Sequence, residues 1–113
     1  MSLEKHGRGV IATLLVHADL IKRGYQVFTE DTGQGIIDLV AVHLETGETK
    51  YIDVKCLARR KDGSRISRIL KDTQKEFEEQ TGLLIDLVYA DVDTGVVEYP
   101  VSRKRHELEK TAA

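Results

Sequence analysis

An aspartate stands inside the most apolar stretch of this 113-residue sequence. Asp38 is flanked by Ile36 and Ile37 on one side and by Leu39 and Val40 on the other. Burying a carboxylate among such side chains costs free energy unless a cation or hydrogen-bond donors compensate its charge. Asp38 is therefore either an acid at the mouth of a strand, where it caps a loop amide, or an acid positioned for chemistry.

A second acid lies in a strand-like segment with strict alternation. Side chains two residues apart share one face of a strand, so Asp53 and Lys55 are expected to project together. Ile52, Val54 and Cys56 then point the other way, into apolar packing. Because an Asp–Lys pair of this kind is also common as a plain surface ion pair, that interpretation stays open.

Turn-forming residues at 45–48 join the two segments, which are expected to pair as a hairpin. This pairing would bring Asp38 and Asp53 close together. Two close carboxylates repel each other unless a divalent cation lies between them, and all-oxygen ligation favours Mg²⁺ or Mn²⁺. Lys55 would then orient or deprotonate a water, or stabilise the charge that develops on a phosphate.

A basic segment, residues 57–68, follows Lys55 directly. It carries five basic residues against one acid, a local charge of +4, whereas the whole chain has −2 and the other residues therefore sum to −6. A basic patch can hold a polyanion even on an acidic molecule, and a solvated surface loop is the plain alternative. The candidate anion-binding residues are Arg59, Arg60, Lys61, Arg65 and Arg68.

Hydrophobic periodicity predicts the elements that must position these residues. The expected fold class is α/β, a mixed central sheet flanked by helices in the order α-β-β-β-α-β-β. We expect one domain over residues 1–113, with a core at about 8–100 and a tail at 101–113 that is a short helix or frays. The expected helices cover 9–23 and a segment from Ile66 to the glycine at 82, and the expected strands are 25–28, 36–42, 51–56, 83–90 and 96–99.

The composition is typical of a globular domain, with 41% hydrophobic and 32% charged residues. No apolar run approaches the ~20 residues of a membrane span, and the first residues lack the apolar stretch of a secretory signal. A single cysteine, Cys56, excludes an intramolecular disulfide framework and a four-cysteine zinc site. These features predict an intracellular protein, in the cytoplasm or nucleoid, or in a host cytoplasm if a phage encodes it, with no membrane partner.

The sequence resembles the PD-(D/E)XK nuclease superfamily in the order of its features. These are an acid in an apolar strand, a hairpin, an Asp-x-Lys motif, a basic loop and a helix. The matching motifs are Ile37–Val40 for the first acid and Ile52–Lys55 for the second acid and the lysine. Residues 20–27 look like the end of the first helix of that fold, and 70–77 like the helix that carries a glutamine in the Holliday-junction resolvase branch. The resemblance extends over roughly residues 8–100 and implies a restriction-endonuclease-like core.

The resemblance implies metal-dependent hydrolysis of DNA phosphodiesters. Asp38 and Asp53 would be metal ligands, the Val54 carbonyl would add a third oxygen, and Lys55 would act on the attacking water. Gln74 would be an accessory polar group near the scissile phosphate. An exposed glutamine beside the apolar face of its helix is the alternative for Gln74.

The sequence departs from the family pattern at one position. Members commonly place a glutamate on the first helix, where this chain has Thr13. Thr13 would bind the metal through water, or His17, one turn further along, would replace it, or the site is weak or inactive. Glu4 and Glu30 are further acids that the sequence does not place, and a solvated helix residue is the plain interpretation of His17.

The sequence therefore predicts a Mg²⁺-dependent endodeoxyribonuclease that is structure-selective, like a Holliday-junction resolvase, with branched or duplex DNA as its substrate. The basic segment would grip phosphates without reading base sequence. A homodimer or higher homo-oligomer is expected, because symmetric cutting of two strands needs two sites related by a two-fold axis. The alternatives are a site-specific homing- or restriction-type endonuclease, and a non-catalytic DNA-binding module that keeps the fold.

Overall fold

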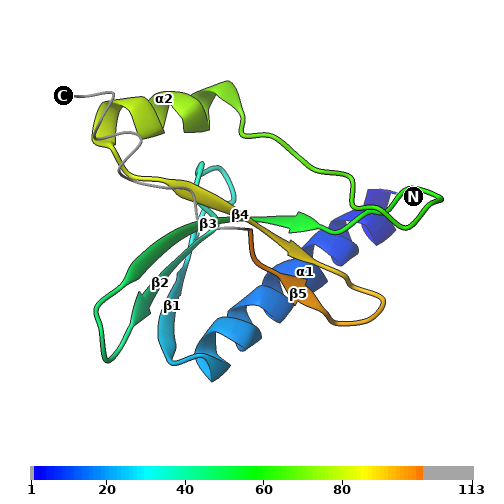
Figure 1. Ribbon diagram of the computed structural model, residues 1–113, viewed down its shortest axis with the longest axis horizontal. Coiled ribbons are helices and arrows are strands. Elements are labelled where there is room, and N and C mark those ends of the chain that lie inside the picture. Colours follow the sequence, from blue (N-terminus) through cyan, green and yellow to red (C-terminus); the bar gives the residue numbers. More distant parts are fainter. Residues whose placement is uncertain (1, 101–113) are drawn as a thin grey trace.

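The computed structural model describes residues 2–100, with side chains from residue 4 onward, and forms a five-stranded mixed sheet with two helices (Figure 1). The order α-β-β-β-α-β-β and the mixed α/β class are confirmed. The expectation of a helix or frayed tail at 101–113 lies outside the described residues. The elements are α1 (Ser2–Lys22), β1 (Tyr25–Thr29), β2 (Leu39–His43), β3 (Thr49–Cys56), α2 (Asp72–Thr81), β4 (Ile85–Ala90) and β5 (Val97–Glu98).

The strands lie in the sheet in the order in which they occur in the chain, β1-β2-β3-β4-β5. Only β3 and β4 are parallel, and the other three neighbouring pairs are antiparallel. Antiparallel neighbours need only short turns, whereas parallel neighbours need a crossover connection. The long loop after β3 and then α2 provide this crossover, so the topology carries the basic segment and the helix with Gln74 away from β3 and back to β4.

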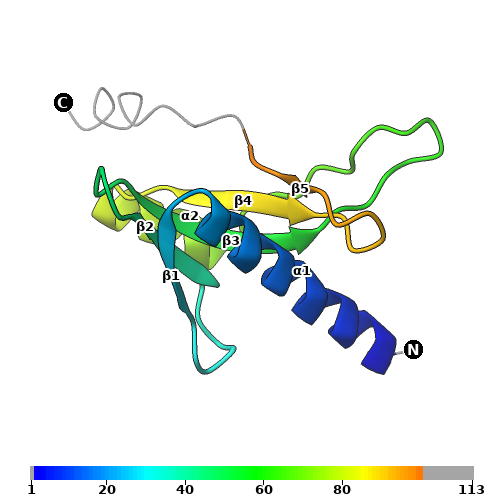
Figure 2. The same ribbon diagram turned by 90° about the horizontal axis from the view of Figure 1, so that it is seen from below.

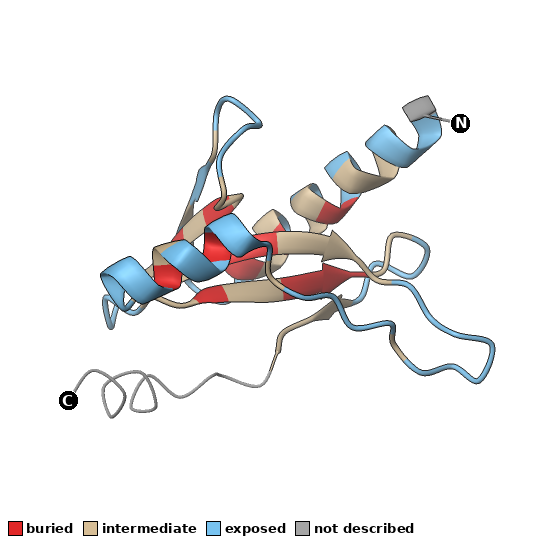
Figure 3. Cartoon of the chain, turned by 90° about the horizontal axis from the view of Figure 1, so that it is seen from above, coloured by how far each residue is buried: buried red, intermediate tan, exposed pale blue. Residues whose placement is uncertain are grey.

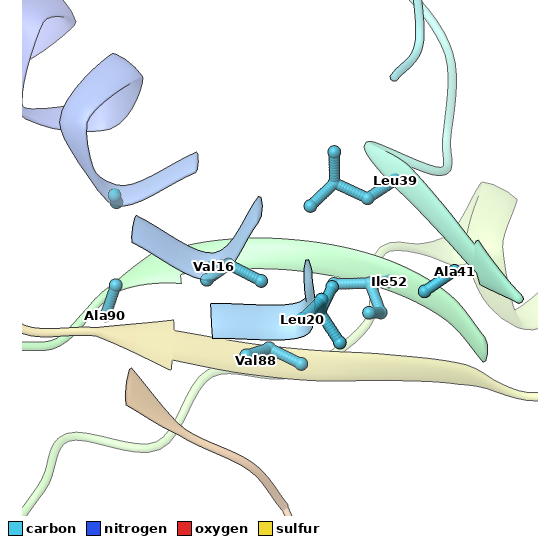
Figure 4. Close-up of a cluster of buried hydrophobic side chains, with 8 residues drawn as sticks. Val16, Leu20, Leu39, Ala41, Ile52, Val88 and Ala90 are labelled. Atoms are coloured by element: carbon cyan, nitrogen blue, oxygen red, sulfur yellow. The ribbon is translucent and has the colours of Figure 1, made fainter. Parts of the chain in front are cut away.

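Helix α1 packs along one face of the sheet, and α2 lies on the other (Figures 2 and 3). Buried residues recur at four-residue spacing on α1, which places Ala12, Val16 and Leu20 on one side of the helix. They pack against Leu39 and Ile52 in the centre of the sheet (Figure 4). The apolar core of the domain therefore lies between α1 and the sheet.

The first helix is longer than its apolar periodicity predicts, since it begins at Ser2 rather than at residue 9. The added residues 2–8 are mostly polar and include a glycine, Gly7, so the core-facing periodicity does not mark them. The expected end is confirmed, because Gly24 follows the helix with φ 94°, a left-handed conformation that favours glycine. Within the described residues, neither helix combines the length and the apolar character that crossing a membrane requires.

The second helix is shorter than predicted and begins at Asp72 rather than at Ile66. Tertiary hydrogen bonds hold the preceding segment outside the helix: the Ile66 amide donates to the Ala58 carbonyl and the Arg68 amide to the Tyr89 hydroxyl. Ile69 is exposed although it stands at helical spacing. The helix ends as expected at Gly82, with φ 74°.

The predicted strand at 36–42 is also displaced, because β2 begins only at Leu39. The side-chain amide of Gln74 donates a hydrogen bond to the Ile36 carbonyl, so Ile36 belongs to a loop that is bonded to α2. Asp38 directly precedes β2, yet its amide donates to the Ile52 carbonyl and its carbonyl accepts from the Glu30 amide. The first acid therefore stands at the entrance of a central strand rather than in its middle.

Candidate active site

The backbone of Asp38 is fixed by neighbours on both sides, and its side chain is fixed by β3. The Val54 amide donates to Asp38 Oδ2 at 2.8 Å. Asp38 thus lies at the mouth of a strand, as one interpretation predicted, but the amide that it accepts from belongs to β3 and not to a loop. This role does not exclude chemistry, because the same hydrogen bond aims the carboxyl group toward β3.

Asp53 and Lys55 share one face of β3, as their spacing predicts. Lys55 Nζ lies 3.2 Å from Asp53 Oδ2, and the lysine side chain is only 16% exposed. Ile52, which precedes Asp53 in β3 and pairs with Leu39, points into the core under α1. The pair is therefore not the exposed surface ion pair that the sequence left open, since Asp53 itself is buried.

The hairpin brings the two acids together, and each changes the proton affinity of the other. Burial and the hydrogen bond with Asp53 raise the pKa of Asp38 to about 6, against the opposing effect of the Val54 amide. Burial by itself would raise the pKa of Asp53 as well, but hydrogen bonds from Asp38 and Gln74, together with the charge of Lys55, lower it. Without a cation the two carboxyl groups therefore hold a shared proton in weakly acidic solution.

This donor set fits a hard divalent cation. Two carboxylates forced together in a half-buried position are stabilised as anions when a positive ion replaces their proton, and oxygen ligands suit Mg²⁺. Within residues 2–100, however, no group of three or more histidine, cysteine, aspartate or glutamate side chains is close enough together to hold a metal. Any further ligands would have to be backbone carbonyls, such as that of Val54, or waters.

Gln74 connects α2 to this pair. Its Nε2 donates both to Asp53 Oδ2 at 3.0 Å and to the Ile36 carbonyl at 2.9 Å. Its Oε1 accepts from the Lys71 amide at the start of α2, as in a capping box. Only 3% of Gln74 is exposed, so the interpretation as an exposed glutamine is wrong. With all of these hydrogen bonds made inside the protein, Gln74 positions Asp53.

Thr13, the first-helix position singled out by the resemblance, shares a groove with Asp38 but not with Asp53 or Lys55. A groove of about 730 Å³ lies between the N-terminal half of α1 and the loop after β1, and Thr13, Glu30 and Asp38 are among the residues that line it. The Thr13 hydroxyl donates to the Gly9 carbonyl of its own helix. His17 is not among the residues lining this groove.

Glu30 organises the loop beside Asp38. Its carboxylate accepts hydrogen bonds from the Thr32 amide and hydroxyl and from the Gly35 amide. These hydrogen bonds lower the pKa of Glu30 to about 2. A Cβ on Gly35 would come within 2.6 Å of Glu30 Cγ, so the closed loop needs a glycine there. The sequence named Glu30 without placing it, and the Glu-x-Thr pattern followed by two glycines was the available signal.

The basic segment leaves the end of β3 and projects beyond the sheet as an exposed loop (Figure 3). Arg59 and Arg65 pair across its base and both contact Glu98 of β5, at 2.8 and 3.3 Å. The Arg65 guanidinium also lies 4.3 Å from the centre of the Tyr89 ring, and Tyr89 is the register partner of Lys55. The base of the loop therefore borders the lysine of the site.

The five basic residues differ in their surroundings. The Arg60 side chain donates a hydrogen bond to the Arg65 carbonyl, so Arg60 also stabilises the shape of the loop. Lys61 and Arg68 have no side-chain partner among residues 2–100, which leaves their charges available to a ligand. The ion pairs with Glu98 have no signal in the sequence, because this acid lies 39 residues beyond Arg59 and 33 beyond Arg65.

The comparisons with known proteins leave the site to be interpreted from its own chemistry. No family model, no curated protein and no solved structure matches this chain.

Proposed function

We propose that the protein is a metal-dependent DNA endonuclease that hydrolyses phosphodiester bonds, with a core like that of the PD-(D/E)XK nucleases. The observation that carries the proposal is the convergence of Asp38, Asp53 and Lys55. Lys55 Nζ is 3.2 Å from Asp53 Oδ2, and Asp38 directly before β2 and Asp53 of β3 are close enough for each to shift the pKa of the other. The element order α-β-β-β-α-β-β and the basic loop directly after β3 support the same interpretation.

Asp38 and Asp53, with the Val54 carbonyl, would hold a Mg²⁺ ion, and Mn²⁺ would substitute for it. When bound, this ion supplies a Lewis acid that stabilises the charge on phosphate oxygens. In the hydrolysis the oxygen of a water bonds to phosphorus, and the bond from phosphorus to the leaving sugar oxygen breaks. Lys55 orients the water and stabilises the developing charge, while Gln74 and the Val54 amide keep the two acids in place.

The basic loop would bind the phosphates that flank the cut. Lys61 and Arg68 offer charges without internal partners, and Arg65 stands beside Tyr89 at the border of the site. Contacts of this kind position a nucleic acid without reading its sequence. The small domain, with no added recognition module among its described residues, supports selectivity for DNA structure, and a homodimer would pair two cuts.

Cleavage of synthetic DNA tests this proposal. We expect the protein to cut a four-way junction faster than a linear duplex of matched sequence in Mg²⁺, and to stop when the metal is chelated. Asp53→Asn and Lys55→Met should each lower cleavage by about 10²–10⁴-fold while DNA binding remains. Glu79→Gln, an exposed acid on α2, is the matched control and should cut normally.

Three outcomes would contradict parts of the proposal. Unchanged cleavage in Asp53→Asn would remove the catalytic assignment. Equal cutting of both substrates would favour a duplex-cutting homing- or restriction-type enzyme. DNA binding without cleavage in either Mg²⁺ or Mn²⁺ would favour a non-catalytic module.

A further inference from the structure

One aromatic side chain lies near Asp38, the first of the proposed catalytic acids. Phe28 in β1 is 50% exposed and is the only exposed aromatic residue between positions 4 and 100. Its register partner is Val40, and residues directly opposite each other share a face of the sheet. Alternation places Asp38 on that same face, two residues before Val40. Phe28 is therefore turned away from the core and toward the side of the sheet that carries the acids.

Phe28 and Asp38 also line the same hollow. This space of about 240 Å³ has apolar walls that include Ile37 and Val40, and Asp38 belongs to it as well as to the groove beside α1. An isolated exposed apolar side chain is normal on a protein surface and carries no inference. Phe28 differs because Asp38, one of the two acids on which the proposed chemistry depends, lines the same hollow.

The chemistry of the substrate identifies what this hollow would hold. The groups covalently closest to a scissile phosphate are its own sugars and bases. A base in a continuous duplex keeps both faces against its neighbours, whereas a base at a branch point or a frayed end can present one face to an aromatic ring. Stacking of this kind tolerates any base, which suits a site that does not read sequence.

We propose that Phe28 stacks on an unstacked nucleobase next to the scissile phosphate and thereby selects branched DNA over continuous duplex. This inference rests on the proposed function and adds to it the feature of the substrate that is recognised. Phe28 acts on selectivity and not on the hydrolytic step. Its loss lowers the preference for a junction and leaves slow cleavage of linear duplex unchanged.

The experiment compares three substitutions at this position with a matched control. Phe28→Ala removes the ring, Phe28→Leu keeps an apolar side chain without the ring, and Phe28→Trp enlarges the stacking surface. Leu44→Ala removes a side chain that is 70% exposed at the turn after β2 and lines neither hollow. Melting temperatures establish that each variant is folded.

The readout is the ratio of cleavage rates on a synthetic four-way junction and on a linear duplex in Mg²⁺. We expect Phe28→Ala and Phe28→Leu to lower this ratio about tenfold, and Phe28→Trp and Leu44→Ala to keep it. Binding is measured in the Asp53→Asn background with 2-aminopurine at the branch point. Its fluorescence should fall on binding when Phe28 is present and not with Phe28→Ala.

Failures at two levels are distinguishable. If the unaltered protein cuts but Phe28→Ala changes the ratio no more than Leu44→Ala does, the stacking role is wrong and the proposed function stands. If light scattering shows that Phe28→Ala converts an oligomer into a monomer, the face is an interface between copies and the stacking role is again overturned. If the unaltered protein neither cuts nor binds either DNA, both proposals fall.

Discussion

The two faces of the same sheet differ in what they bury. Under α1 the buried side chains are hydrocarbon, with Leu20 and Ile52 at the centre (Figure 4). On the α2 side the buried residues include polar groups, above all Asp53 of β3 and Gln74 of α2, beside Ile85 and Tyr89 of β4. Because neighbouring residues of a strand face opposite sides, one strand, β3, supplies both environments.

This contrast separates the source of stability from the candidate chemistry. Hydrocarbon burial stabilises a fold in proportion to the area removed from water, whereas buried carboxylates cost free energy that their partners only offset. Ile52 contributes to the first and Asp53, its neighbour, to the second. The α1 face can therefore hold the domain together while the α2 face keeps two acids whose burial costs free energy.

The largest loss of stability should come from removing a buried side chain on the α1 face. Leu20→Ala removes a fully buried side chain and should lower the free energy of unfolding by about 2–5 kcal/mol. Ile21→Ala, the next residue on the same helix, alters an exposed side chain and should change it by less than about 0.5 kcal/mol. Urea denaturation of both variants measures the difference, and equal losses would contradict the assignment of the core.

A smaller loss of stability should follow from removing the hydrogen bonds of Gln74 on the α2 face. Gln74→Leu leaves Asp53 and the Ile36 carbonyl without their donor, which should lower the free energy of unfolding by about 1–3 kcal/mol. Cleavage should fall as well, because Asp53 is no longer held. Gln80→Leu, exposed on the same helix, is the control.

A Gln74→Leu protein with the stability and cleavage of Gln80→Leu would show that the amide does not position the acid.

An acid near the rim of the α1 face should show the opposite pH behaviour to Asp38. Burial would raise the pKa of Asp19, but hydrogen bonds from the Tyr99 hydroxyl at 2.6 Å and Arg23 Nε at 2.8 Å outweigh it and lower the pKa. A lowered pKa means that Asp19 stabilises the fold above its usual value of 3.8, and that this contribution is lost as the pH falls below it.

Asp19→Asn should therefore destabilise the protein by about 1 kcal/mol at pH 7 and by less at pH 3. Chemical denaturation of both proteins at several pH values measures the difference. A difference between them that does not shrink on acidification would contradict the role of the carboxylate charge.

The smallest effect is expected at the basic loop. Glu98→Gln releases Arg59 and Arg65 from their ion pairs, so DNA affinity at low salt should rise by a few-fold and its salt dependence should steepen. Fluorescence anisotropy over a salt series measures both quantities, with Glu79→Gln as the control. An unchanged salt slope would indicate that these two arginines do not meet phosphate.

Much of the fold follows from local patterns. The order of elements, both helix ends at glycine and the shared face of Asp53 and Lys55 are all predicted by the sequence and confirmed. The sequence does not predict where the two helices and β2 begin. Helix α1 begins earlier than predicted because polar residues extend it beyond its apolar stripe. Hydrogen bonds to Ala58, Tyr89 and Gln74 likewise hold apolar segments in loops.

The residues of the candidate site likewise fall into those that local spacing predicts and those that only the packing places. Residue type and period-2 spacing were enough to nominate Asp38, Asp53 and Lys55, because these depend on neighbours in one strand or one hairpin. The buried role of Gln74, the clamp of Glu98 on two arginines and the position of Phe28 beside Asp38 depend on contacts between residues far apart in the chain. Spacing along a sequence carries no information on such contacts, so only the packing of helix, loop and strands decides them.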